Sequence, residues 1–218
     1  MNLQFLIILG FIILSAIIYV LFLQEKETFD NRKNKVIVCF FGVVPRSIKY
    51  TFSSIQNRLL NKLKQYYDVD IFVFNLKVNN LVDNTTLDNN DINIIPYNYL
   101  EEYEQANLDK EIDFICNNIK CKFRQNYDKL RVRNGIRQMY SEYRVGSFLE
   151  KNQGKYDAAV ICGPDYYLAN NINLNDFEQS LVNNQVYTSQ VNDAQGYTNG
   201  FYFGKISRLI PILKRYKE

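Results

Sequence analysis

The chain has 218 residues, of which 47% are hydrophobic and 22% charged, and its formal net charge is +3. This balance is typical of one globular domain with an additional segment, and so small a net charge argues against nucleic-acid binding. Because the sequence contains no histidine, a Ser-His-Asp or Cys-His nucleophile, a histidine-ligated zinc site and a histidine general base are all excluded.

The first segment of the chain is strongly apolar. Leu3 to Leu23 contains no charged side chain, and a helix of about 21 residues can cross a hydrocarbon core of roughly 30 Å. We therefore predict a single transmembrane helix at residues 3–23. Several basic residues follow this span, which favours a cytoplasmic domain but leaves the orientation open because acidic residues are interleaved with them. These basic residues are Lys26, Arg32, Lys33 and Lys35.

The rest of the chain begins with a strand–helix–strand pattern, after an anchor at residues 1–24 and a polar linker at 25–35. Val36 to Phe41 is a continuous apolar run, which predicts a strand buried on both faces. Apolar residues recur at helical spacing from Thr51 to Tyr66, and Val69 to Leu76 is a second buried strand. Two strands joined in this way should be parallel and connected by a right-handed crossover.

Further patterns complete a domain that extends over residues 36–218. We predict a short strand at 92–98, a polar helical region at 100–130, an amphipathic helix at 132–150 and a third buried strand at 156–165. Strands at 184–189 and 200–205 and a basic C-terminal helix follow. The predicted fold class is α/β, with a mostly parallel sheet flanked by helices.

Candidate binding residues lie where the predicted strands end, because open α/β sheets bind ligands beyond the carboxyl ends of their strands. Gly42 and Arg46 follow the first strand, and Asp165 ends the third. A glycine permits a positive φ, a guanidinium can hold a phosphate bidentately, and a carboxylate suits a divalent cation. The alternatives are a turn with a solvated arginine and an aspartate that caps a turn.

The long amphipathic helix carries a second group of cations. Arg133 and Arg137 are one helical turn apart and share a face. They could point toward a polyanion or simply keep the helix soluble, and the sequence favours the second interpretation.

Three segments together resemble a family of GT-A-type glycosyltransferase-like proteins of bacteria and giant viruses. They are CFFGVVPRSIKYTFSSI, RNGIRQMYSEYRVGSFLEKNQGKYDAAVICGPDYYL, and VYTS with GYTNGFYFGK. The resemblance covers most of the chain between Val36 and Arg208. The chain differs from the family in its R-x-D-like motif, which reads Gly163-Pro164-Asp165, and in ending soon after the last of these segments.

The resemblance implies a GT-A or Rossmann-like sheet, a nucleotide-sugar donor and a divalent metal, Mn²⁺ or Mg²⁺, held near Asp165. It implies that Gly42 and Arg46 line the donor site. Arg137 and Tyr140, on the helix behind that site, and Asp165 would also bind the donor. Asn199 takes the polar position near an acceptor. No residue is assigned as catalytic.

Three functions therefore remain open at this stage. The first is a membrane-anchored glycosyltransferase that uses a nucleotide-sugar donor. The second is a non-catalytic, glycosyltransferase-like membrane protein with a structural or interaction role, suggested by the altered motif. The third is a membrane-tethered sensor that binds a phosphate ligand through the Arg46 turn alone.

Overall fold

The computed structural model of the protein describes residue 15 and residues 34–78, 87–118, 129–189 and 200–217. The transmembrane helix predicted at residues 3–23, apart from Ser15, and the acceptor-side Asn199 lie outside these residues. Within the described part of the chain, no helix is both long and apolar enough to cross a membrane. The α/β unit is Lys35–Glu218.

The described residues form one six-stranded sheet in the order β3-β2-β1-β4-β6-β5. β1 pairs in parallel with both β2 and β4, and β2 pairs in parallel with β3. β6 pairs antiparallel with β4 and β5. The strands are β1 (Lys35–Gly42), β2 (Asp68–Lys77), β3 (Tyr99–Glu104), β4 (Ala158–Cys162), β5 (Tyr187–Thr188) and β6 (Phe201–Lys205).

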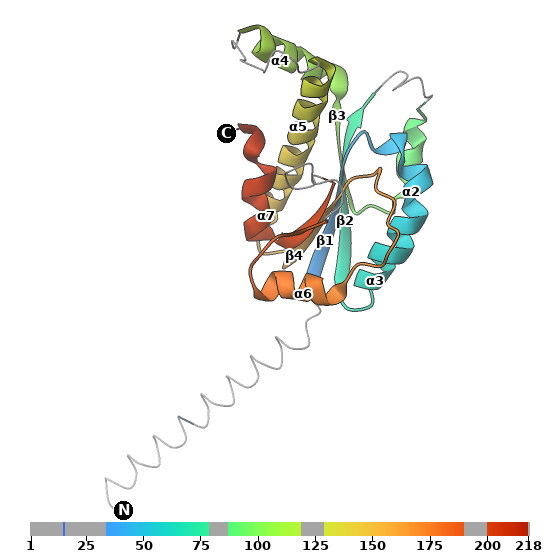
Figure 1. The fold of residues 1–218 in the computed structure, drawn as a ribbon, viewed down its shortest axis with the longest axis vertical. Coiled ribbons are helices and arrows are strands. Elements are labelled where there is room, and N and C mark those ends of the chain that lie inside the picture. Colours follow the sequence, from blue (N-terminus) through green and yellow to red (C-terminus); the bar gives the residue numbers. More distant parts are fainter. Residues whose placement is uncertain (1–14, 16–33, 79–86, 119–128, 190–199, 218) are drawn as a thin grey trace, which may run out of the picture. The chain divides into compact units, whose positions relative to one another are not determined.

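Helices cover both faces of this sheet (Figure 1). The α-helices are α2 (Ile48–Ile55), α3 (Asn61–Leu63), α4 (Gln105–Asn118), α5 (Lys129–Lys151), α6 (Leu174–Val182) and α7 (Ile206–Leu213). Shorter helical segments are η1 (Val44–Arg46), η2 (Gln56–Leu60, of π type), η3 (Asn89–Ile94) and η4 (Arg215–Lys217).

The placement of the helices follows from the strand order. The chain moves from β1 outward to β2 and β3, and then returns to the other side of β1 to form β4. Because parallel crossovers are right-handed, reversing the direction of travel places the connecting helices on the opposite face. Accordingly, α2 and α3 lie on one face of the sheet and α5 on the other (Figure 1). The predicted α/β class and mostly parallel sheet are thus confirmed.

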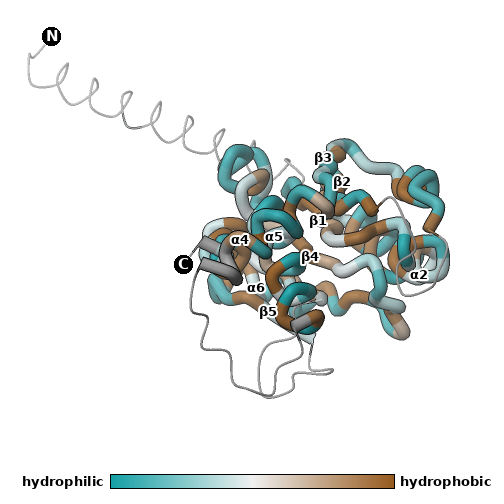
Figure 2. The backbone as a smooth tube through the Cα atoms, turned by 90° about the horizontal axis from the view of Figure 1, so that it is seen from above, coloured by the Kyte–Doolittle hydropathy of each residue, from teal (hydrophilic) through white to brown (hydrophobic). Residues whose placement is uncertain are grey.

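Each face of the sheet has its own hydrophobic core. Alternate residues of β1 point to opposite faces, so that Val38 belongs to the core beneath α2 and Cys39 to the core beneath α5. The first core also includes Phe177 of α6, and the second includes Leu209 of α7. Figure 2 shows apolar residues along the central strands and on the helix sides that face them. Burial on both faces explains the continuous apolar runs of the central strands.

Two local predictions were wrong, and one helix was not predicted. Residues 92–98 do not form a strand: Asn89–Ile94 is a 3-10 turn, whose start is capped by the Asp88 carboxylate accepting from the Asn90 amide. The strand is Tyr99–Glu104 instead, within the region predicted to be helical from residue 100. It is an edge strand, so its half-exposed side chains lack the apolar run of a central strand. Helix α6 was not predicted.

Candidate functional site

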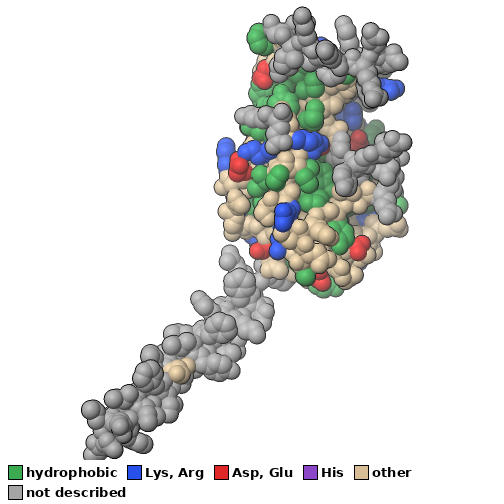
Figure 3. Space-filling model, turned by 60° about the vertical axis from the view of Figure 1, so that its left-hand side comes forward, with side chains coloured by type: hydrophobic (Ala, Val, Ile, Leu, Met, Phe, Trp, Pro, Cys, Tyr) green, Lys and Arg blue, Asp and Glu red, His purple; other side chains and the backbone are tan. Residues whose placement is uncertain are grey.

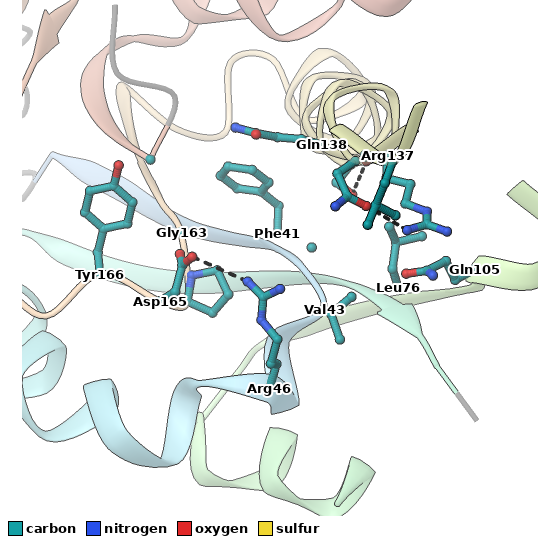
Figure 4. A pocket seen from close by; sticks show the side chains of 16 residues that line it. Phe41, Val43, Arg46, Leu76, Gln105, Arg137, Gln138, Gly163, Asp165 and Tyr166 are labelled. Carbon is teal, nitrogen blue, oxygen red and sulfur yellow. Dashed lines mark hydrogen bonds and ion pairs between the residues drawn. The ribbon is translucent and has the colours of Figure 1, made fainter. Parts of the chain in front are cut away.

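A cavity of about 490 Å³ opens beyond the carboxyl ends of β1 and β4 (Figure 4). These neighbouring strands are the two from which the chain continues in opposite directions across the sheet. Such a switch point is where doubly wound α/β sheets bind ligands, because the diverging connections leave a crevice there. The lining comes from the end of β1 and the turn after it, the end of β2, Gln105 at the start of α4, α5, the turn after β4, and Gly200.

Arg46 and Asp165 face each other across this cavity. A guanidinium nitrogen of Arg46, Nη2, lies 3.5 Å from Oδ2 of Asp165, and both side chains are about half exposed, at 41% and 52%. Figure 4 shows the Arg46 side chain reaching toward Asp165 from the turn after β1. The two residues predicted from the strand ends therefore share one pocket and form an ion pair in it.

The turn that carries Arg46 is held in place by Asn75, near the end of β2. Gly42 has φ +104°, a conformation that favours glycine, and the chain then enters the 3-10 turn Val44–Arg46. Asn75, which is fully buried, accepts from the Val44 amide at 3.2 Å and donates to Glu102 Oε1 at 3.0 Å. Asn75 at a strand end is thus a support for the turn.

The turn that carries Asp165 is fixed by α2. The buried hydroxyl of Thr51 donates to the Pro164 carbonyl at 2.6 Å. One helical turn further on, the Ser54 hydroxyl accepts from the Leu168 amide at 3.1 Å. These partners are more than 110 residues apart in the chain, and no local sequence signal indicates them. Both turns of the site are therefore held by buried hydrogen bonds.

Glycines shape the wall next to Asp165. A β-carbon on Gly163 would lie 3.0 Å from the Asp165 carboxylate and 3.1 Å from the Tyr166 ring. The Gly163 amide donates to the Gly200 carbonyl at 2.6 Å, which joins the β4 turn to the start of β6. A side chain at position 163 would therefore have to displace Asp165 or Tyr166 slightly.

Arg137 lines the cavity, but its guanidinium is bound elsewhere. Its Nε and Nη2 donate to the two carboxylate oxygens of Asp109 at 2.8 and 2.7 Å, and its Nη1 donates to Asn134. This bidentate pair joins α5 to α4. Arg133 likewise pairs with Asp113 of α4. Arg133 and Arg137 are therefore bound to acidic side chains of α4, which neither the polyanion nor the solvated-face interpretation anticipated.

Tyr140 does not line the cavity. It is 7% exposed and packs within an aromatic cluster that includes Phe74, Tyr103 and Tyr216. Its hydroxyl accepts from Arg144 at 3.4 Å. The resemblance implies that Tyr140 binds the donor, but its contacts in the structure are those of a core residue.

A buried acid lies behind the cavity wall. Glu142 of α5 is fully buried, pairs with Arg215 and accepts from Gln138, whose side chain lines the cavity. Burial raises the pKa of Glu142 to about 7, although Arg215 and Gln138 both act to lower it. Burial also raises the pKa of the nearby Tyr202 hydroxyl. No pattern in the sequence indicates that a carboxylate is buried here.

Within the described part of the chain, the donor atoms around Asp165 do not fit a resident divalent cation. Among the described residues, no three cysteine or acidic side chains gather closely enough to hold a metal ion. Asp165 is the one carboxylate among the described residues that line the cavity, and its partner is already a cation. Ca²⁺ and Mg²⁺ take six or more oxygen ligands. One carboxylate that is already paired with a guanidinium supplies too few of them.

Surface charge outside the cavity is mixed. Figure 3 shows basic side chains beside acidic and apolar ones on one face of the molecule. In the cavity, the charge of Arg46 is opposed by Asp165 and that of Arg137 by Asp109. The site therefore pairs its charges instead of presenting a large field of one sign.

Fold and site together define an α/β protein with a ligand-sized cavity at the switch point of its sheet. No protein-family model matches the chain, and no curated protein matches it in sequence.

Proposed function

We propose that this protein is a membrane-anchored glycosyltransferase that binds a nucleotide-sugar donor in the switch-point cavity. One observation carries the proposal: Gly42, Arg46 and Asp165, selected from the sequence as strand-end residues, line a single cavity. The parallel order β3-β2-β1-β4 is the kind of open α/β sheet that binds ligands beyond its strand ends. Membrane attachment through residues 3–23 is part of the same proposal and rests on the sequence.

The cavity suits a ligand of this size and chemistry. Its volume, about 490 Å³, lies within the range of small-molecule sites. Arg46 offers a guanidinium for a phosphate. Phe41 and Tyr166 offer ring surfaces, and Gln105 and Gln138 offer amides for a sugar or a base. A nucleotide sugar needs these three kinds of contact.

Binding to the full-length protein in detergent micelles tests the proposal. Isothermal titration calorimetry with UDP-glucose, UDP-N-acetylglucosamine and GDP-mannose should give saturable binding of at least one donor, in buffer with Mn²⁺ or in buffer with EDTA. Arg46→Gln should weaken it, whereas Lys49→Gln should not. Lys49 is a nearby cation that pairs with Asp91 and does not line the cavity. Heats of dilution alone for every donor would disprove donor binding.

A non-catalytic protein with the same fold is the second candidate. The observation in its favour is that the one carboxylate among the described cavity residues is bound to Arg46. It predicts donor binding without release of UDP or GDP over hours. Donor hydrolysis or transfer that Arg46→Gln abolishes and Lys49→Gln preserves would exclude this candidate.

A further inference from the structure

We infer that Arg46 itself binds the anionic group of the ligand without a metal ion, and that Asp165 is the counter-ion which this anion displaces. The inference rests on the proposed function, since it concerns the same cavity. It differs from the expectation drawn from the resemblance, in which Asp165 holds a divalent cation. The Arg46–Asp165 pair and its surroundings carry it.

The pair can be opened at little cost. Its closest atoms are 3.5 Å apart, and both side chains are about half exposed. Solvent-accessible ion pairs of this kind contribute only about 0–1 kcal/mol, because water screens them and both side chains lose freedom. A ligand phosphate, which accepts two parallel hydrogen bonds from a guanidinium, can therefore replace the Asp165 carboxylate as the partner of Arg46.

The backbone on both sides of the pair stays in place while the side chains exchange partners. Asn75 holds the Arg46 turn through the Val44 amide, and Thr51 holds the Asp165 turn through the Pro164 carbonyl. Both supporting side chains are buried. A guanidinium held in this way is preorganised for a ligand, which reduces the entropy that binding costs.

The same arrangement disfavours a divalent cation at Asp165. Such a cation would have to displace Arg46 from its one carboxylate and then remain near a free guanidinium. Two other described carboxylates near the cavity are engaged: Asp109 binds Arg137 bidentately, and Glu102 accepts from Asn75 and lies 3.9 Å from Lys77. The described donor set thus favours an anion on Arg46 over a cation on Asp165.

The two assignments predict opposite effects for one substitution. If Asp165 is only the counter-ion, Asp165→Asn frees Arg46, and binding should become tighter by up to about fivefold, the equivalent of the 0–1 kcal/mol of the pair. If Asp165 holds a metal that bridges to the ligand, the same change should abolish binding. Arg46→Gln should weaken binding by about 10- to 100-fold in the first case, as loss of a charged hydrogen-bond partner does.

Calorimetric titration of the full-length protein with UDP and with GDP decides between them. We expect the wild-type protein to bind UDP or GDP in EDTA, with a Kd that changes less than about threefold when Mn²⁺ replaces EDTA. Asp165→Asn should keep or tighten this binding, Arg46→Gln should weaken it, and Lys49→Gln should leave it unchanged. Unfolding midpoints of all variants identify any that fail to fold; because both site residues are half exposed, neither substitution should prevent folding.

The contrary outcomes separate this inference from the proposed function. Binding that requires Mn²⁺ and is lost in Asp165→Asn overturns the inference but leaves donor binding intact. Equal loss in Asp165→Asn and Arg46→Gln also overturns it, because the counter-ion would then be required for binding. The absence of any nucleotide binding, with or without Mn²⁺, overturns both.

Discussion

The ring of Tyr166 lies directly against the backbone of Gly200, where a β-carbon would be 1.7 Å from Cε2 and 2.0 Å from the hydroxyl oxygen. Tyr166 follows β4 and Gly200 precedes β6, and both line the cavity. A glycine is thus required at the start of β6 for the Tyr166 ring to keep its position. The contact joins two segments that form one wall of the site.

Gly200→Ala should therefore change the cavity more than the fold. The ring is the far end of a flexible side chain and can rotate away, so we expect a loss of about 1–3 kcal/mol in the free energy of unfolding, as for other overpacked sites. The displaced ring should also change UDP affinity, which calorimetry measures. Gly135→Ala is the matched control, because its β-carbon would meet nothing within 4 Å in the middle of α5.

For that control we expect a gain of about 0.5–1 kcal/mol, since alanine favours a helix over glycine, and unchanged UDP affinity. Similar changes in UDP affinity for both variants would show that the Tyr166–Gly200 contact does not shape the site.

The hydrogen bond from Thr51 to the Pro164 carbonyl gives a second prediction. Thr51→Val has nearly the same shape but leaves this buried carbonyl without its 2.6 Å partner. We expect the free energy of unfolding to fall by about 1–3 kcal/mol, the cost of an unsatisfied buried group. Thr51→Ser keeps the hydroxyl and should lose about 1 kcal/mol or less for the methyl group. Urea denaturation followed by circular dichroism measures both; a Thr51→Ser loss as large as that of Thr51→Val would contradict the assignment.

Sequence patterns predicted the centre of this fold better than its edges. β1, β2 and β4 are continuous apolar runs because helices bury them on both faces. β3 was missed because an edge strand with glutamates at positions 101, 102 and 104 has no such run. α6 was missed because it is a short amphipathic helix, and its N-cap, Asn173, resembles an ordinary loop residue.

The site could be predicted only where it follows from topology. Residues that end adjacent parallel strands must meet at one edge, which is why Gly42, Arg46 and Asp165 were placed together correctly. The partner of Arg137 could not be predicted, because Asp109 lies 28 residues away on another helix. Such pairings depend on how helices dock, which a single sequence does not specify.

Asn75 provides a third prediction, through its contacts with the buried Val44 amide and with the Glu102 carboxylate. Asn75→Asp keeps an acceptor for the Val44 amide but loses the donor to Glu102 and places a second carboxylate beside it. We expect a loss of about 1–3 kcal/mol at pH 7. Burial and the negative neighbour should raise the pKa of the introduced carboxyl, so part of the loss should be recovered as the pH falls toward 5.

Asn98→Asp is the control for this substitution. Asn98 is exposed and, like Asn75, its side chain accepts from a backbone amide, here that of Ile71 in β2, at 2.7 Å. It should show a much smaller loss with little pH dependence. Equal losses for the two variants in urea denaturation at pH 7 would argue against the role assigned to Glu102.

Glu142 gives a fourth prediction, on the pH dependence of stability. Its pKa is raised to about 7 by burial, so the folded state binds a proton that the unfolded state releases near pH 4.3. The contribution of Glu142 to the free energy of unfolding is fully present below the pKa of the unfolded state. It falls as the pH rises toward 7 and stays low above pH 7. The expected decrease is on the order of 1–3 kcal/mol. The absence of histidine leaves this pH range free of its usual titrating side chain.

Glu142→Gln should remove this slope, so that the variant gains stability relative to the wild type as the pH rises from 5 to 7.5. Glu150→Gln is the matched control on the same helix, because Glu150 is half exposed and pairs with Lys214 at 2.6 Å. That variant should keep the wild-type slope. Urea denaturation at half-unit pH intervals measures all three proteins. A Glu142→Gln profile that runs parallel to the wild type would mean that Glu142 is ionised at pH 5, held so by Arg215.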